Sequence, residues 1–343
     1  MKKALFIFLY WSSLAANQSL IDPSPVHMMM NPCPAQSLVN SVDFHPTKNQ
    51  CCVTLTHNQR VIILNLDEEN GLTIFQELFH PVSQLGHPQH AVYSPDGQSL
   101  VVANWSSQTF TIYHADVHGY FDESPAAIIP YPEELKHHRP HGIAFSSTGE
   151  YLAVAFGAST LHPRGVALFA ANHLENLTLL DLLESDEVYE GIPKGVAFSP
   201  DDSCLVVTLS ATNAVALYTL DWTNHAILSP PRQLLKGAST GISRPEDIKF
   251  TRDGNHCAVT NSSNDTITFY DYDDQSIVGE TPAFTLKNPE GRLSFPHGIT
   301  FSPDGEYLLV TQFGPVQFDR NSNLHSWGNV RRDCVAVYKM NLN

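Results

Sequence analysis

Basic residues are scarce in this chain. It has 19 Lys and Arg against 35 Asp and Glu, which gives a formal net charge of -16 at pH 7. A nucleic-acid-binding body needs surplus cations to neutralise phosphates, so the composition argues against that class. The chain also lacks an apolar run of roughly 18 residues or more, so we expect no integral membrane segment once the N-terminal segment described below is removed.

The familiar catalytic signatures are missing as well. The sequence contains no G-x-S-x-G nucleophile elbow, no H-E-x-x-H zinc motif and no phosphate-binding loop. Any catalytic site would therefore have to combine residues from separate parts of the chain.

What the chain does contain is one pattern repeated six times. Its clearest copy, HGITFSPDGEYLLV at 297–310, joins a β-prone run to an apolar run through a Ser-Pro-Asp-Gly turn. An aromatic residue anchors each copy, at spacings of 49, 52, 53, 52 and 51 residues: Phe44, Tyr93, Phe145, Phe198, Phe250 and Phe301. A period of about 50 residues in an all-β pattern is typical of a propeller.

Each repeat supplies four strands, but the last repeat stops after its third strand, at 335–340. The segment 25–44 aligns without a gap with 282–301, which contains the last strand of one repeat and the first strand of the next. We therefore expect residues 26–30 to supply the missing strand, a velcro closure that leaves no open sheet edge. The prediction is an all-β, six-bladed β-propeller that forms a single domain over residues 20–343.

The first 19 residues are typical of a secretory signal peptide. Lys2 and Lys3 precede an apolar run, and small residues follow through Ala16. The alternative is that this short run is another propeller strand. A periplasmic or secreted location would suit a disulfide between Cys33 and Cys334, which the closure should bring close together.

Loops of variable length gather on one face of such a propeller, here called the top face, and function is expected there. From this face the chain enters the channel at one polar residue per blade: Asn40, Gln89, His141, Lys194, Glu246 and His297. We predict that these residues bind a small-molecule or protein ligand at the channel mouth, while the plainer alternative is that they face channel water. The residues next inward are expected to be small or apolar.

A second ring is expected where the second strand of each blade ends. Its candidate ligand-binding members are Asn104, Asn261 and Gln312. The longest top loop, 313–334, is expected to form a lid or to be merely flexible. It carries Arg331, one of many bases placed on the top face, where they would tolerate an anionic ligand.

Histidines are concentrated in two adjacent top loops. Four of them are His87, His90, His137 and His138. Their imidazoles could hold Zn²⁺ or another divalent metal, although Lys194 in the ring would repel a cation. In an enzyme, His141 or His297 would be the base and Glu246 would orient it, while Lys194 or Arg331 would hold an anion.

The repeat PHGITFSPDGEYLLV, followed by VAVY at 335–338, resembles the repeats of YVTN or lactonase-type propellers, and the resemblance covers about 40–343. It implies either a binding protein or a lactone hydrolase similar to 6-phosphogluconolactonase. Gluconolactonase-like enzymes hold a channel metal through carboxylate and Asn ligands, which the resemblance would place at Glu246 with Asn104 or Asn261. Two hypotheses follow: an exported propeller that binds a ligand or protein on its top face, or a lactonase-type hydrolase, metal-assisted or not.

Overall fold

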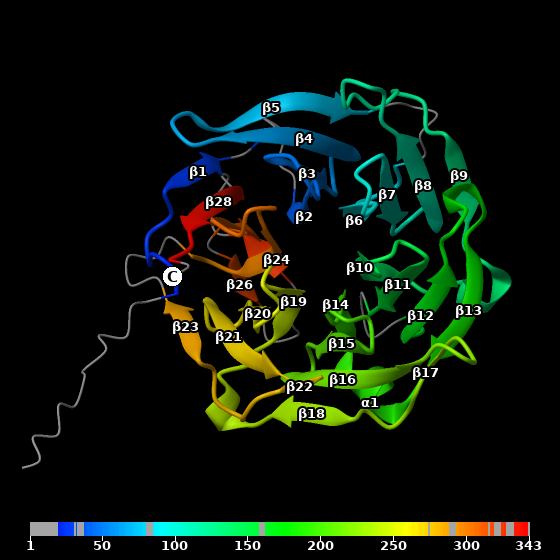
Figure 1. The fold of residues 1–343 in the computed structure, drawn as a ribbon, viewed down its shortest axis with the longest axis vertical. Helices are drawn as coiled ribbons and strands as arrows, with labels where there is room; N and C mark the ends of the chain where they lie inside the picture. The colour runs from blue at the N-terminus through cyan, green and yellow to red at the C-terminus, as the bar shows by residue number, and fades with distance from the viewer. Residues whose placement is uncertain are drawn as a thin grey trace, which may run out of the picture.

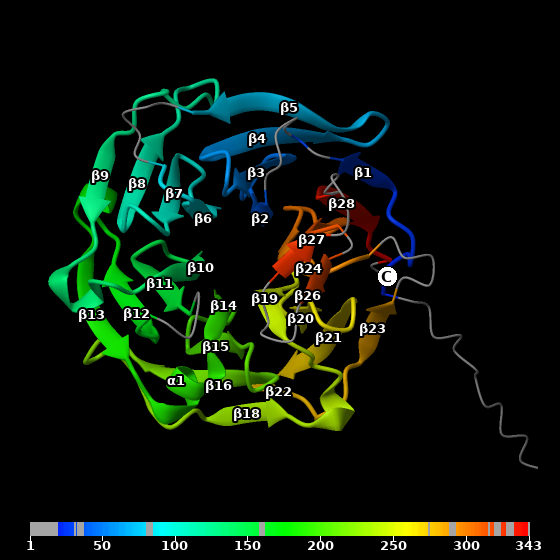
Figure 2. The ribbon, with the colours of Figure 1, turned by 180° about the vertical axis from the view of Figure 1, so that it is seen from behind.

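The computed structural model describes residues 20–30, 32, 38–79, 85–157, 162–273, 275–287, 293–314, 316–318, 324–326 and 333–341. Six sheets of this part of the chain are arranged in a ring around a central axis (Figure 1). The inner strands lie around the centre and the outer strands lie on the rim, and the view from behind shows the same ring (Figure 2). The predicted six-bladed β-propeller is confirmed.

Blades 1 to 3 each contain four antiparallel strands in chain order from the channel outward. Blade 1 consists of β2 (Val39–Phe44), β3 (Gln50–Leu55), β4 (Arg60–Asp67) and β5 (Gly71–Leu78). Blade 2 consists of β6 (Pro88–Tyr93), β7 (Ser99–Asn104), β8 (Thr109–His114) and β9 (Ala127–Pro130). Blade 3 consists of β10 (Pro140–Phe145), β11 (Tyr151–Phe156), β12 (Gly165–Ala170) and β13 (Thr178–Leu183).

In blades 4 and 5 the outer strand is divided in two, and both parts pair with the third strand. Blade 4 consists of β14 (Pro193–Phe198), β15 (Cys204–Leu209), β16 (Ala214–Asp221), β17 (Ala226–Ile227) and β18 (Gln233–Lys236). Blade 5 consists of β19 (Pro245–Phe250), β20 (His256–Asn261), β21 (Thr266–Asp273), β22 (Ser276–Ile277) and β23 (Phe284–Lys287). Blade 6 consists of β24 (Pro296–Phe301), β25 (Tyr307–Gln312), β28 (Cys334–Lys339) and β1 (His27–Met30).

The remaining elements lie in the connections between strands, either within a blade or between two blades. They are the paired strands β26 (Val316–Phe318) and β27 (Leu324–Ser326), the 3-10 helices η1 (Glu133–Leu135), η2 (Leu174–Asn176) and η3 (Ala238–Thr240), and the helix α1 (Asp186–Gly191). Ser185 caps α1 by accepting a hydrogen bond from the backbone N–H of Val188. None of the described helices has the length and apolar composition needed to cross a bilayer.

The hydrophobic core lies between the blades. Second strands such as β7 and β15 are buried along their whole length, because each blade is packed between two neighbours. These strands therefore read as continuous apolar runs rather than as an alternating pattern. Between blades 1 and 6, for example, Val42 and Val53 belong to the same buried cluster as Leu309 and Val337.

The N-terminal segment closes the ring as the sequence predicts. Strand β1 pairs antiparallel with β28, with His27 opposite Val337 and Met30 opposite Cys334 (blue beside red in Figure 1). Ile21 extends the contact through a bridge to Met340 and is fully buried. The last sheet of the chain is thus completed by its beginning.

An irregularity of pairing shapes every inner strand. In β19, Pro245 lies opposite Asn261 and Ile248 lies opposite Val259, so the inner strand has one residue more than its partner between these pairs. The same shift occurs at the start of the other five inner strands. A bulge of this kind re-aims side chains. It turns two successive residues, such as Glu246 and Asp247, toward the channel.

Glycines let adjacent inner strands approach closely at this level. A Cβ on Gly142 would lie 2.4 Å from the carbonyl oxygen of Lys194, and one on Gly195 would lie 2.6 Å from the Cα of Asp247. Any side chain at these two positions would push neighbouring blades apart, so the glycines keep the channel narrow here.

Several predictions fall outside the described residues. They are the signal peptide, Cys33 and most of the loop 313–334, including Arg331. The disulfide and the lid therefore stay predictions. Cys334 is buried, and its Sγ accepts a hydrogen bond of 3.1 Å from Gln312 Nε2.

Ile21→Ala tests whether the segment before β1 holds the ring closed. We expect it to lower the free energy of unfolding by about 2–4 kcal/mol, because it leaves a cavity in a fully buried site. The matched control is Val26→Ala, at a side chain that is 43% exposed, where we expect a change below about 0.5 kcal/mol. Urea denaturation measures both values, and equally small losses would contradict the closure.

Candidate active site

The predicted ring residues meet at one level of the channel. Each is the second residue of an inner strand, and together they are Asn40, Gln89, His141, Lys194, Glu246 and His297. We call this ring the neck. All of its members except Lys194 line a common cavity of about 10 Å³. That space suits one water molecule.

Glu246 is the centre of the neck. Its Oε2 lies 3.6 Å from Nε2 of His141 and 3.5 Å from Nε2 of His297. The same oxygen lies 3.6 Å from Nζ of Lys194. The Glu246 side chain is only 3% exposed. One buried carboxylate therefore gathers polar side chains from blades 3, 4 and 6.

Two residues that the sequence analysis did not single out hold the other oxygen of Glu246. Ser262 Oγ donates a hydrogen bond of 3.0 Å to Oε1, and Arg244 Nε lies 3.9 Å from the same atom. Burial by itself would raise the pKa of Glu246. The charge of Lys194, that of His297 when it is protonated in acid, the charge of Arg244 and the Ser262 hydrogen bond outweigh burial and hold this pKa below its usual value. Glu246 is therefore ionised at neutral pH.

The positions of Arg244 and Ser262 beside Glu246 could have been predicted from the strand register. Arg244 directly precedes the proline that opens β19, and Ser262 directly follows the end of β20. The N–H of Ser262 donates a hydrogen bond of 3.1 Å to the carbonyl oxygen of Arg244, and Ser262 Oγ lies 2.9 Å from the same oxygen. Extending the predicted strand pairing by one residue would have placed both beside Glu246.

The ring of His297 is fixed from behind. Its Nδ1 lies 2.8 Å from the carbonyl oxygen of Asn40. Because a carbonyl only accepts, Nδ1 carries the proton and Nε2 presents a lone pair to Glu246. Phe313 stacks on the ring with a centroid separation of 4.7 Å. Burial lowers the pKa of His297 more than the Glu246 charge raises it, so the imidazole is neutral at pH 7.

His141 is held in the same charge state. Burial, followed by the charges of Lys194 and His297, lowers the pKa of His141 well below its usual value. Its ring also makes a hydrogen bond to the backbone of Lys194. With that bond made, Nε2 faces Glu246 as an acceptor.

Three acceptors therefore converge on one small space. Glu246 Oε2 has no hydrogen-bond partner among the described residues. The facing lone pairs of His141 and His297 repel it unless a donor or a cation lies between them. A water molecule supplies two donors and fits the cavity volume.

The side-chain atoms that converge on this cavity could also ligate a metal ion. Within the described part of the chain, the donor atoms of His141, Glu246 and His297 lie within 4.8 Å of one another, and two imidazoles with a carboxylate suit Zn²⁺ and related ions. Lys194 and Arg244 weigh against a cation. A side-chain cation about 4 Å from a metal ion, at an effective dielectric constant of about 20, repels each unit of charge on the ion by about 4 kcal/mol. The charges around Glu246 favour water.

The layer below the neck differs from the sequence expectation. The third residue of each inner strand was expected to be small or apolar, and this is wrong in blades 2 and 5, which place His90 and Asp247 there. Burial, followed by the charge of Lys249, lowers the pKa of His90 well below its usual value. Burial raises the pKa of Asp247 to about 6, against the opposing charge of Lys249. The bulge turns both residues into the channel, and an unbulged alternation does not predict this.

The second predicted ring braces the blades. Asn104 and Asn261 are fully buried, and their Nδ2 atoms donate to Thr111 Oγ1 at 2.9 Å and to Thr268 Oγ1 at 3.0 Å. Gln312 is 2% exposed and bonded to Cys334. These side chains are engaged inside the protein.

The four predicted metal histidines are placed separately. His90 lines the neck cavity. His87 Nδ1 makes a hydrogen bond of 3.0 Å with Ser106 Oγ, and His137 is exposed. His138 is buried, with Nε2 3.6 Å from Glu184. Among the described residues, these histidines do not form a common group of metal-ligating atoms.

Comparison with known proteins places these observations in a family. A family model described as "Lactonase, 7-bladed beta-propeller" matches residues 34–233, more than half of the chain. The description names seven blades, whereas this chain forms six. No curated protein sequence matches the chain.

Many solved structures share the fold. The luciferin-regenerating enzyme is 16% identical with a TM-score of 0.63, over 92% of this chain and 95% of that one. The periplasmic gluconolactonase of Pseudomonas aeruginosa is 16% identical with a TM-score of 0.57, over 86% and 85%. A candidate 6-phosphogluconolactonase from Bacteroides uniformis is 15% identical with a TM-score of 0.58, over 87% and 85%. At these identities the similarity shows the fold alone.

Glu246→Gln tests the charge state of the neck through stability. Because the pKa of Glu246 is lower in the folded protein than its usual value of 4.5, its ionisation stabilises the fold above that pH, and this contribution is lost as the pH falls through the folded pKa. We expect the variant to be less stable by about 1–3 kcal/mol at pH 7, with a gap that narrows toward pH 3. Denaturation at several pH values measures the gap. The control Glu150→Gln, on an exposed turn, should show no such trend, and a gap for Glu246→Gln that widens in acid would contradict the assignment.

Proposed function

The chain belongs to the lactonase family of β-propellers, and on this premise we propose that it hydrolyses a lactone, a cyclic ester, at the neck. The observation that carries the proposal is the convergence of three acceptors on a water-sized cavity beside Lys194. Attack of water on an ester needs an acceptor for the proton of the water and a cation for the developing oxyanion. The neck offers both within one small space.

Each neck residue has a role in the proposed reaction. The water held by Glu246, His141 and His297 attacks the carbonyl carbon of the lactone, and its proton passes to His297 Nε2. The resulting imidazolium is stabilised by Glu246 on one side and by the Asn40 carbonyl on the other. Lys194 stabilises the oxyanion. When the ring C–O bond breaks, the alkoxide takes the proton from His297, and the product is a hydroxy acid.

The proposed substrate class rests on the residues at the top of the channel and on the names of two structural neighbours. The cavity at the neck has room for one water molecule, so the lactone has to rest above it, on the top face. Lys194 and Arg244 flank Glu246 there and favour a lactone that carries an anionic group or yields a carboxylate. Sugar-derived lactones are the class named for two structural neighbours, a gluconolactonase and a candidate 6-phosphogluconolactonase.

A binding protein is the second candidate. An exported propeller that holds a small molecule or a protein on the same face, without turnover, would use the same ring residues. The small volume of the neck cavity favours it, because only one atom of a ligand could reach Glu246. Turnover separates the two candidates.

The direct test is hydrolysis of a panel of aldonolactones and their 6-phosphates. We expect Glu246→Gln and His297→Gln each to lower kcat/KM by about 10²-fold or more, because each removes a group that handles the proton. His256→Gln is the matched control, since His256 also faces a carboxylate, Asp271 at 3.2 Å, but lies outside the neck. EDTA should leave the rate unchanged. Absence of turnover in the wild-type protein, or full activity in both neck variants, would contradict the proposal.

Export is part of the proposed function. The ring uses residues from Ile21 onward, so removal of the first 19 residues would leave the closure intact. We therefore expect a mature protein in the periplasm or the medium that lacks about the first 19 residues. Intact-mass measurement of the protein from its native host checks this, and a full-length chain in the cytoplasm would contradict it.

A further inference from the structure

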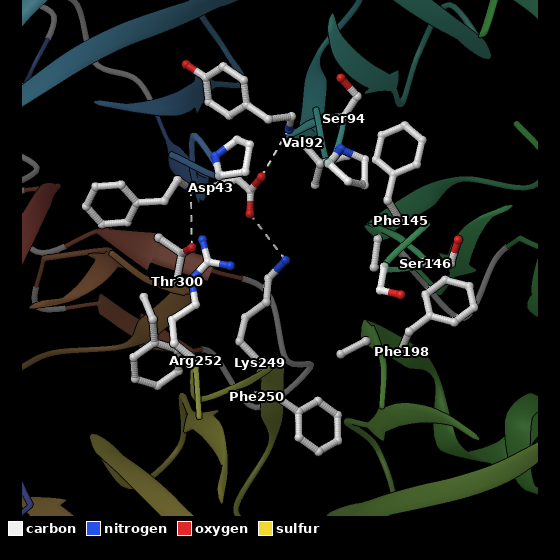
Figure 3. Close-up of a pocket in the computed structure, with 18 residues that line it drawn as sticks. Asp43, Val92, Ser94, Phe145, Ser146, Phe198, Lys249, Phe250, Arg252 and Thr300 are labelled. Atoms are coloured by element: carbon white, nitrogen blue, oxygen red, sulfur yellow. Dashed lines mark hydrogen bonds and ion pairs between the residues drawn. The ribbon is translucent and has the colours of Figure 1, made fainter. Parts of the chain in front are cut away.

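A second pocket opens at the opposite end of the channel from Glu246. Its volume is about 400 Å³, within the range of small-molecule sites. It is lined by the ends of the inner strands and by the turns that follow them, and it includes all six aromatic residues that anchor the repeats. We call it the lower pocket (Figure 3).

The lower pocket has a charged side and an apolar side. Blades 5, 6 and 1 contribute Lys249, Thr300 and Asp43 at the fifth position of their inner strands. At the same position, blades 2, 3 and 4 contribute Val92, Ala144 and Ala197. Figure 3 shows Lys249 reaching toward Asp43, with Phe145 and Phe198 on the other side. A ligand would meet polar groups on one wall and rings and methyl groups on the other.

Lys249 is a cation whose ammonium group has N–H donors left for a ligand. Burial opposes its charge, but Asp43 and Asp247 outweigh burial and raise the pKa of Lys249. Its Nζ donates to Asp43 Oδ1 at 3.4 Å, which is a long hydrogen bond. An ammonium carries three N–H groups, and the Lys249 side chain is 17% exposed, so donors remain for a ligand.

Arg252 adds a second cation at the rim. It occupies the position of the repeat's turn that is proline in blades 1, 2, 4 and 6. Its Nε donates to the carbonyl oxygen of Ser302 at 3.3 Å, which fixes the guanidinium against blade 6. Burial raises the pKa of Asp43, and the charges of Lys249 and, more weakly, Arg252 oppose this shift, so Arg252 lies near the Lys249–Asp43 pair. Both cations depart from the chain's own repeat and face the same cavity.

We propose that the lower pocket is a binding site for a small organic monoanion that carries an apolar group, such as an aryl or alkyl carboxylate. Within the lining, two cations face one carboxylate, which favours an anionic ligand. The charge of Asp247 also acts on Lys249 from outside the lining, so we expect the ligand to carry no more than a single negative charge. The apolar body packs on Phe145, Ala144 and Ala197. This site lies at the other end of the channel from the neck and is independent of the reaction proposed there.

The test is a ligand-observed NMR titration of the full chain with phenylacetate, with neutral 2-phenylethanol as the uncharged comparison. We expect saturable binding of phenylacetate with a Kd on the order of 1 mM, and binding of the alcohol at least about fivefold weaker. Lys249→Ala and Arg252→Pro should each weaken phenylacetate binding by at least about fivefold. Arg252→Pro restores the residue that four other turns contain, so it keeps the test valid if removal of Lys249 leaves Asp43 unpaired and unfolds the protein.

Lys194→Ala serves as the control that separates the two ends of the channel. Phenylacetate binding unchanged by Lys194→Ala and weakened by Arg252→Pro supports the lower pocket. Loss of binding in Lys194→Ala alone would assign the anion to the neck and overturn the proposal. Absence of saturable binding, unchanged binding in Arg252→Pro, or equal binding of the alcohol would overturn it as well.

Discussion

Closure of the ring is the constraint on which the rest of the structure depends. Because β1 pairs with β28, the last blade obtains its fourth strand from the start of the chain and the ring of six blades is closed. Each inner strand then presents the same sequence positions at the same depth, and residues that are about 50 apart in the chain become neighbours. Single unlike residues in an otherwise regular repeat can therefore meet in the channel, as Glu246 and His297 do.

Blade 5 supplies much of the channel's chemistry. Its inner strand, β19, carries Glu246 at the neck, Asp247 in the layer below and Lys249 in the lower pocket. The bulge at Glu246 and Asp247 turns both carboxylates inward, and the strand alternation returns Lys249 to the channel two residues later. Their charges act on one another, since Lys249 opposes the burial that raises the pKa of Asp247 to about 6. The two ends of the channel are thus joined by one strand.

Much of this architecture can be predicted from the sequence, because the repeat and the turn chemistry fix strand order and the alignment of 25–44 with 282–301 fixes the closure. The ring of entry residues follows from the same register. The layer of titratable residues at His90 and Asp247 cannot be predicted in this way. A bulge changes which side chains face the channel, and no local sequence pattern indicates the bulge. Asn104 and Asn261 show another limit of sequence-based prediction. A polar residue at the end of a strand can form hydrogen bonds to buried neighbours instead of facing a ligand, and the sequence does not distinguish the two. The lower pocket was not predicted, because the short turns that line it were interpreted as purely structural. Lys249 and Arg252, which depart from the repeat there, were the available signal.

We propose that the ligand reacts at the neck, with Glu246 at its centre. The most direct measurement is a crystal structure of the protein soaked with an aldonate, the open-chain product of a sugar lactone. We expect the carboxylate of the aldonate to lie within hydrogen-bond distance of Lys194 and His297. Density for the aldonate only in the lower pocket or elsewhere on the surface, with none at the neck, would contradict a reaction at the neck.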